Sequence, residues 1–124
     1  MSSMWSIPDV SSIKTPLTIL REQANHLTNQ TDGLIVGMVE TSGSGDNINN
    51  SFKFVVPSLN RYTYVFLKYN HELISMYPGV MISVPENRGY QVRDEKSFND
   101  TLNAIISSET TALLVKSLLA QAAS

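Results

Sequence analysis

The sequence predicts one α+β domain, in which a meandering antiparallel sheet of four to five strands has one helix before it and two after it. Apolar residues recur at helical spacing over 15–30, and again from 97 to the end of the chain. Between these stretches, segments rich in aromatic and β-branched residues are separated by turn residues and not by helices. Such a succession favours an antiparallel meander over parallel strands joined by helices. The expected order of elements is therefore α-β-β-β-β-β-α-α.

The first helix is expected to begin at Pro16, after an extended lead-in over residues 1–14. Thr15 supplies a hydroxyl at the N-cap, and proline is favoured at the first helical position because its missing N–H is not needed there. The helix should end before Gly33. Its apolar stripe consists of Leu17, Leu20, Ala24 and Leu27. A single folded domain is expected over 15–124.

The strands are expected over 34–41, 52–56, 62–69, 80–84 and 90–93. Residues 42–50 contain two glycines and many short polar side chains, so we interpret them as a mobile hairpin loop. Residues 71–77 fit either a turn of helix or an irregular crossover, and 87–89 fit a hairpin turn.

The C-terminal region predicts two helices. Residues 97–100 match a capping box, which marks the start of the first of them. Its expected buried face consists of Phe98, Leu102, Ile105 and Ile106. Ser107 and Ser108 interrupt that helix and cap the next, and Glu109 then suits the positive end of the last helix.

The composition excludes several classes of function. The chain has 124 residues, a net charge of −2 and no cysteine, which excludes disulfides, thiolate metal sites and cysteine nucleophiles. Its charge does not favour duplex nucleic acid or an anionic membrane, and its apolar runs are too short to cross a bilayer. The N-terminus lacks the features of a signal peptide. We expect a cytoplasmic protein of bacterial type, without cofactor or membrane association.

No catalytic residue and no metal ligand can be assigned from the sequence. His71 is a candidate general base near a strand end, but adjacent residues of a strand face opposite sides, so Glu72 is not expected to cooperate with it. A transition-metal site needs three or four ligands, and with two histidines and no cysteine we expect no such site. The candidate ligand-binding residues are His71, Glu72 and Tyr64, around a pocket between the sheet and the helices.

The predicted sheet has apolar residues on both of its faces. Phe52, Phe54 and Phe66 alternate onto one face, and the second face still carries apolar side chains that would need cover. The last helix is also apolar over more than a narrow stripe. A symmetric homodimer explains both excesses, and a third helix behind the sheet is the alternative. The candidate interface residues are Leu114, Leu118, Leu119, Val65, Leu67 and Met81.

These patterns favour a non-catalytic protein–protein interaction or adaptor module that self-associates, as a dimer, and also binds an unidentified protein partner. One alternative is a small-ligand-binding domain or modest hydrolase with a pocket near His71. A second alternative is single-stranded nucleic acid binding on an aromatic sheet face, where Phe54 and Tyr64 would stack bases beside Lys53 and Lys68. The acidic net charge argues against nucleic acid as a partner.

Overall fold

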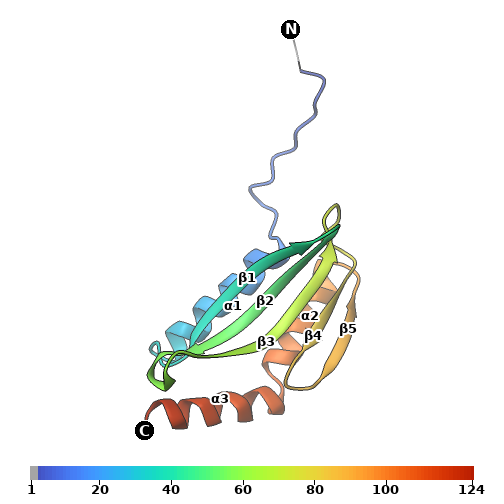
Figure 1. Ribbon diagram of the computed structural model, residues 1–124. Helices are drawn as coiled ribbons and strands as arrows, with labels where there is room; N and C mark the ends of the chain where they lie inside the picture. The colour runs from blue at the N-terminus through green and yellow to red at the C-terminus, as the bar shows by residue number, and fades with distance from the viewer. Residues whose placement is uncertain (1–2) are drawn as a thin grey trace.

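The computed structural model describes residues 3–124, and it confirms the α+β class and the order of elements (Figure 1). Helix α1 precedes the five strands, and helices α2 and α3 follow them. The strands form one sheet in the order β1-β2-β3-β4-β5, and every neighbouring pair is antiparallel. The elements are α1 (Pro16–Gln30), β1 (Val36–Ser44), β2 (Asn47–Val56), the 3-10 helix η1 (Pro57–Leu59), β3 (Tyr62–Glu72), β4 (Gly79–Ser83), β5 (Arg88–Val92), α2 (Glu95–Ile106) and α3 (Glu109–Ala122).

Helix α1 has the start that the sequence predicts. The Thr18 amide donates a 3.1 Å hydrogen bond to the Thr15 side chain, and Pro16 occupies the first turn. At the other end, Gly33 adopts a φ of +78°, a backbone conformation that favours glycine. The helix therefore ends before Gly33, as expected.

The first hairpin is longer and tighter than the sequence predicts. Residues 42–50 are not a mobile loop: β1 continues to Ser44, Gly45 and Asp46 form the turn, and β2 begins at Asn47. Polar side chains stabilise this extension across the strands, because Thr41 Oγ1 donates a 2.8 Å hydrogen bond to Asn50 Oδ1. The polar composition of this segment is typical of a loop, and it does not reveal that the two strands pair here.

Residues 71–77 resolve into the end of a strand and an irregular connection. β3 continues through Glu72, and residues 73–78 then lead to β4. The Leu73 amide donates a 2.7 Å hydrogen bond to the Asp46 carbonyl oxygen, which ties this connection to the tip of the first hairpin. The end of the sheet thus contains two neighbouring turns.

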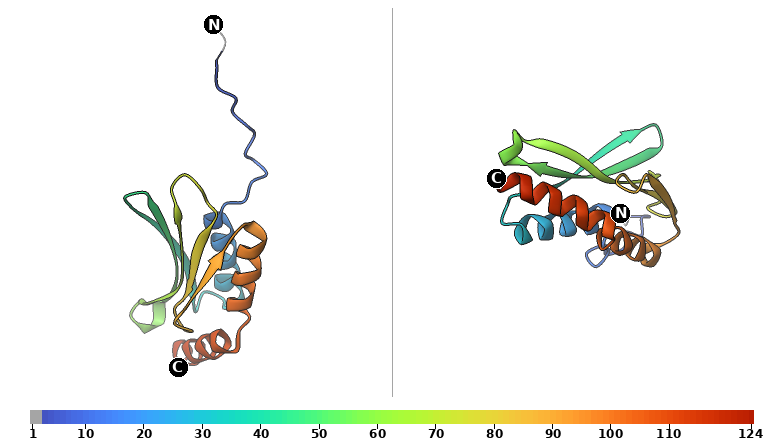
Figure 2. Two further views of the ribbon diagram at one scale, coloured as in Figure 1. Left: turned by 90° about the vertical axis from the view of Figure 1, so that its right-hand side faces the viewer. Right: turned by 90° about the horizontal axis from the view of Figure 1, so that it is seen from below.

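All three helices lie on one face of the sheet, and the other face is uncovered (Figure 2). α1 packs on β1 and β2, α2 packs on β4 and β5, and α3 lies at the end of the sheet next to η1. Ser58 Oγ donates a 2.9 Å hydrogen bond to the Ala122 carbonyl oxygen and so links η1 to α3. The hydrophobic core lies between the sheet and these helices, and its largest fully buried side chains include Tyr69, Phe52, Phe54, Phe66, Phe98 and Leu20.

A β-bulge in β3 determines which side chains reach this core. Phe52 pairs with Leu67 and the next residue, Lys53, pairs with Val65, so Phe66 has no partner on β2. Both Phe66 and Leu67 are consequently buried, with exposed fractions of 1% and 0%. The Phe66 ring stacks on Phe54 with 4.7 Å between centroids.

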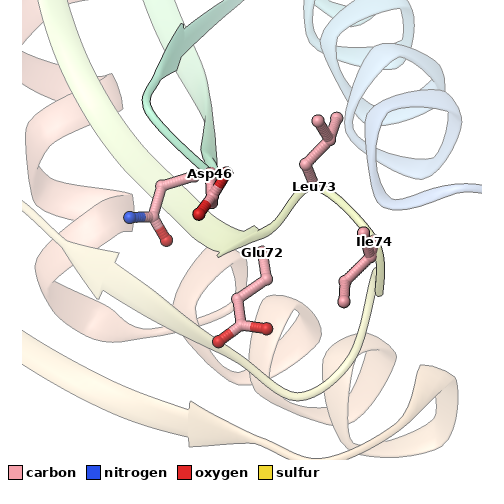
Figure 3. A pocket seen from close by; sticks show the side chains of 5 residues that line it. Asp46, Glu72, Leu73 and Ile74 are labelled. Carbon is pink, nitrogen blue, oxygen red and sulfur yellow. The ribbon is translucent and has the colours of Figure 1, made fainter.

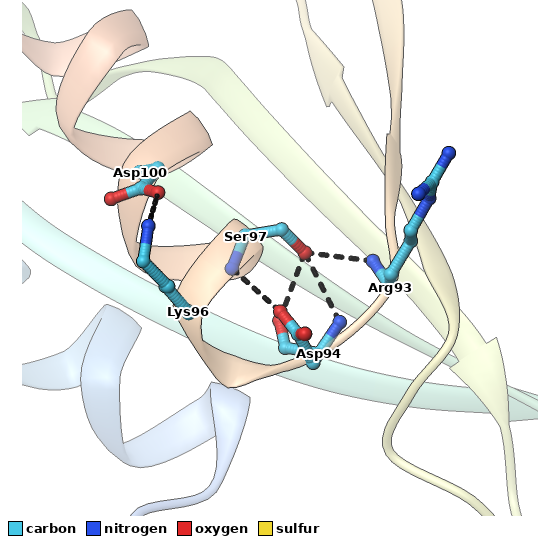
Figure 4. Close-up of polar contacts among 5 residues, drawn as sticks. All are labelled: Arg93, Asp94, Lys96, Ser97 and Asp100. Carbon is cyan, nitrogen blue, oxygen red and sulfur yellow. Dashed lines mark hydrogen bonds and ion pairs between the residues drawn. The ribbon is translucent and has the colours of Figure 1, made fainter.

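The start of α2 differs from the predicted capping box. The N-cap is Asp94 and not Ser97: the Asp94 carboxylate accepts a 2.8 Å hydrogen bond from the Ser97 amide, and Ser97 Oγ accepts one of 3.1 Å from the Asp94 amide (Figure 4). The reciprocal pattern of a capping box is present one turn earlier than expected. Ser97 is therefore the N3 residue of the capping box and not its N-cap.

Candidate functional site

The uncovered face of the sheet is mainly apolar near its centre. We define the uncovered face by the side chains of Val36, Met38, Val55, Val65, Val80 and Ile82, which alternate with the core positions along their strands. Most of these side chains are half-buried, and Met38 is the most exposed at 39%. Two lysine side chains also project from this face. Lys53 forms a 2.8 Å ion pair with Glu40, and Lys68 lies opposite Ile82.

The structure places only some of the predicted sheet interface on this face. Val65 lies on the uncovered face, as the alternation of β3 predicts. Leu67 and Met81 belong instead to the core and are fully buried, so their assignment to the second face is wrong. For Leu67 the reason is the bulge, which shifts the alternation of β3 by one residue. For Met81 the reason is that β4 is almost entirely apolar, so its sequence carries no alternation.

The predicted interface residues of α3 face inward. Leu118 is buried at 7% exposure, and Leu114 and Leu119 are half-buried against the core. Leu113 is the large apolar side chain of α3 that is exposed, at 59%. Most apolar side chains of α3 thus pack against the core at the end of the domain, and α3 offers little apolar surface to a partner.

A small hollow lies beside His71 on the helix side of the sheet. It has a volume of about 220 Å³ and is lined by Thr15, Pro16, Leu17, Thr41, Ile48, Asn50, His71 and Met76. His71 Nδ1 donates to the carbonyl oxygens of Glu72 and Ser75, at 2.8 and 3.2 Å. Because both partners are acceptors, Nδ1 carries a proton in these contacts.

The three predicted ligand-binding residues are not brought together. Tyr64 packs against Phe54 in the middle of the sheet, with 6.3 Å between ring centroids, and burial raises the pKa of its hydroxyl. His71 lies seven positions further along β3, which corresponds to more than about 20 Å along a strand. Glu72 follows His71 and does not line the same hollow. A shared pocket of Tyr64, His71 and Glu72 therefore does not exist.

Glu72 instead contributes to a second hollow at the tip of the first hairpin (Figure 3). This hollow has a volume of about 440 Å³ and is open, with Asp46, Asn47, Glu72, Leu73 and Ile74 around it. Both of its carboxylates are exposed, with Asp46 in the hairpin turn and Glu72 at the end of β3. No group of three or more His, Asp and Glu side chains in the described part of the chain could hold a metal ion. Leu73 and Ile74 are exposed at 62% and 90%.

The aromatic and basic residues proposed for base stacking lie on opposite faces. Phe54 is buried beneath the helices at 2% exposure, and Tyr64 is half-buried against it. Lys53 and Lys68 project from the uncovered face, and Lys53 is already paired with Glu40. Stacking requires an accessible ring, and the Phe54 ring is not accessible in this fold.

Residues 3–13 form an extended segment, here called the N-terminal arm, that projects away from the domain (Figures 1 and 2). Its described hydrogen bonds are all internal to the arm. The first attachment to the domain follows it, where Lys14 forms a 3.3 Å ion pair with Glu22. The exposed apolar side chains of the arm are Met4 (100%), Trp5 (82%), Ile7 (81%), Val10 (61%) and Ile13 (51%).

Sequence reasoning missed the apolar character of this arm and part of the uncovered face. The arm has no helical or strand periodicity, so its apolar residues were treated as an ordinary lead-in. On β4, the polar residue Ser83 is fully buried, whereas Val80 and Ile82 face outward. Because the one polar residue of β4 points into the core, residue types do not indicate which face is which, and only the strand pairing reveals it.

In residues 3–124, no helix combines the length and apolar character that crossing a membrane requires. Comparison of the chain with family models, with curated proteins and with solved structures gave no significant match.

Proposed function

We propose that this protein is a non-catalytic interaction module that self-associates, with the uncovered face as a contact surface between copies. The observation that supports the proposal is the position of the helices. All three lie on one side of the sheet, which leaves Val65 and Ile82 at the centre of an apolar surface without cover. Apolar surface of this kind, rimmed by polar residues, is typical of a contact site between proteins.

The rim of the uncovered face agrees with this proposal. Gln91 and Arg93 lie toward the β5 edge, and Asn49 and Asn70 lie toward the hairpin tips. An apolar centre with a polar rim is the usual arrangement of a protein interface. An isologous contact of two such faces would bury the apolar centres against each other.

The ligand-binding alternative is less well supported. The hollow beside His71 is small, and no carboxylate lines it to act with the imidazole. The wall of this hollow includes Pro16, Leu17, Ile48 and Met76, which favours an apolar side chain over a polar substrate as its occupant.

The test is sedimentation equilibrium of the full chain over a concentration series. We expect the wild-type protein to self-associate and Val65→Glu to be monomeric, because a carboxylate at the centre of the face would be desolvated in the contact. Gln91→Glu introduces the same charge at the rim and should associate as the wild type does. A wild-type protein that stays monomeric at every concentration would refute the proposal. Thermal unfolding of both variants checks that they fold.

A further inference from the structure

We propose that the N-terminal arm of one copy adds as a strand to the free edge of β1 in a second copy, and that two copies exchange arms reciprocally. This inference rests on the proposed function in one respect, since it takes a second copy of this chain as the partner. It involves a different part of the sheet, the outer edge of β1, and it reaches the uncovered face only at Met38.

The outer edge of β1 is protected over only half of its length. Ile35, just before β1, has both backbone groups bonded to Thr31 Oγ1, and the Gly37 amide donates a 2.9 Å hydrogen bond to Thr28 Oγ1. Alternate residues of a strand direct their backbone groups to the same side, so those of Val39, Thr41 and Gly43 also point outward. β1 has β2 as its neighbour and, in the described chain, nothing on its outer side.

This free half-edge has few of the features that normally discourage strand addition. Proteins protect edge strands with short length, charge or proline. β5, the other edge, has five residues, begins with Arg88 and is followed by Arg93. β1 has nine residues, and Glu40 is its one charged side chain. Of the two edges, β1 is therefore the one that accepts another strand.

Apolar surface adjoins the free half-edge on both sides of the sheet. On the uncovered face, Met38 is 39% exposed. On the helix side lies the hollow beside His71, whose wall includes Thr41 of β1 together with Leu17 and Ile48. Because side chains of an added strand alternate between the two sides, apolar residues of the arm can contact Met38 on one side and this hollow on the other.

The arm has the properties that such a strand requires. It is already extended, and its exposed apolar side chains are close together in sequence, with Trp5 and Ile7 on the same side of an extended chain. Pro8 lacks an amide, which is tolerated in an edge strand when that position faces solvent. Tryptophan is also among the residues most enriched at the energetic centres of interfaces.

The arm cannot add to its own β1 without an unfavourable crossover. α1 runs opposite to β1, so an arm on its own β1 edge would lie parallel to β1 with α1 as the connection. The helices lie behind the sheet of Figure 1 and β1 is its left edge, which makes this connection left-handed. Crossovers between parallel strands are right-handed in about 98% of cases. A second copy therefore provides the β1 edge.

The area of a reciprocal exchange is sufficient for a stable dimer. An extended chain exposes roughly 1.45 Å² per dalton, so seven residues of the arm expose about 1,100 Å². If half of that is buried against an equal acceptor area, one arm contributes about 1,100 Å², slightly below the range of about 1,200–2,000 Å² for specific interfaces. Two arms contribute about 2,200 Å², which exceeds it. Exchange in both directions is thus favoured over a single arm.

Trp5 makes the test direct, because it is the only tryptophan of the chain. Its fluorescence emission therefore reports on the arm alone. We would record emission and sedimentation equilibrium on the same dilution series of the full-length protein. The inference expects a dimer whose emission is shifted to the blue, with a shift to the red as the dimer dissociates.

Two pairs of variants locate the contact. Thr41→Pro removes an outward amide from β1, whereas Thr41→Ala loses the same hydroxyl and keeps the amide. Ile7→Asp places a charge among the apolar residues of the arm, whereas Ser12→Asp places it at an exposed polar position of the same arm. We expect the first member of each pair to raise the dissociation constant by about tenfold or more. The second members should remain within about twofold of the wild type. Ile7 and Ser12 are exposed and lie outside the hydrophobic core, so neither arm substitution is expected to unfold the domain.

The outcomes separate this inference from the proposed function. A dimer with red emission at all concentrations, or with unchanged affinity in Ile7→Asp, refutes the arm exchange and leaves self-association intact. Blue emission that does not depend on concentration shows that the arm binds its own domain, which also refutes the exchange. A dimer lost in Ile7→Asp but kept in Val65→Glu supports the exchange and refutes the uncovered face as the contact. A protein that is always monomeric refutes both.

Discussion

The Gly37 backbone in β1 lies directly against the Ala24 backbone in α1. A Cβ atom on Gly37 would be 2.5 Å from the Ala24 carbonyl oxygen and 2.6 Å from its Cα, closer than real Cβ contacts. These neighbours are backbone atoms, so they cannot move aside as the end of a flexible side chain could. The glycine thus permits the close approach of α1 to the sheet.

We predict that Gly37→Ala destabilises the protein by about 1–3 kcal/mol, because the added methyl group separates α1 from β1. Urea unfolding measures the change. Gly43→Ala is the matched control in the same strand, since its Cβ would meet atoms no closer than 3.7 Å. The control should change the free energy of unfolding by less than about 1 kcal/mol. Equal effects of the two substitutions would contradict the close packing of α1 on β1.

The bulge in β3 leads to a second prediction. Simple alternation assigns Val65 and Leu67 to the same face, whereas the bulge places Leu67 in the core and Val65 on the uncovered face. Leu67→Ala should therefore lower the free energy of unfolding by about 2–5 kcal/mol. Val65→Ala should lower it by about 1 kcal/mol or less. Similar losses at both positions in denaturant unfolding would show that β3 has no bulge.

Tyr77 and Tyr69 should respond differently to loss of their hydroxyl groups. The buried Tyr77 hydroxyl has no hydrogen-bond partner among the described residues, whereas Tyr69 donates a 2.7 Å hydrogen bond to the Met76 carbonyl oxygen. Tyr77→Phe should be neutral or stabilising by about 1 kcal/mol, and Tyr69→Phe should be destabilising by a similar amount. Thermal unfolding at neutral pH compares the two, and a larger loss in Tyr77→Phe would contradict the structure.

Tyr77 should also make the protein sensitive to alkali. Burial, together with the Glu95 and Asp94 carboxylates, raises the pKa of Tyr77 from 10.0 to about 12. Because the folded state binds this proton more tightly, the stabilising contribution is complete below pH 10 and is lost as the pH rises toward 12. Unfolding measured across this range should be less pH-dependent in Tyr77→Phe than in the wild type. An identical pH dependence would exclude Tyr77 as a cause.

The N-cap of α2 predicts a loss of stability in acid. The hydrogen bond from the Ser97 amide lowers the pKa of Asp94 below its usual value of 3.8. The ionised Asp94 carboxylate therefore stabilises the folded state above pH 3.8. This stabilisation is lost as the pH falls through the lower pKa of the folded state. Asp94→Asn keeps an acceptor at the N-cap without a titrating proton. Its melting temperature should therefore vary less with pH in this range, and an unchanged pH profile would contradict the cap.

The sequence was sufficient for the elements with strong local signals. Thr15 and Pro16 marked the start of α1, and the β-branched and aromatic runs marked the strands. It was insufficient where distant pairing decides the outcome. The polar ladder between Thr41 and Asn50, the extra residue at Phe66 and the inward Ser83 each depend on a neighbouring strand. Two of the proposed interface residues, Leu67 and Met81, were misplaced for this reason, whereas Val65 lies before the bulge and was placed correctly.

The order of the elements has a kinetic consequence. Each strand pairs with the next along the chain, α1 packs on the strand that follows it, and α2 packs on the strand that precedes it. Such local contacts need little loop closure before they form, so this part of the domain should fold fast for a sheet protein. The contact of Ser58 with Ala122 is different, because it joins residues 64 positions apart. Docking of α3 should therefore be a late step, and its release should be the first step of unfolding.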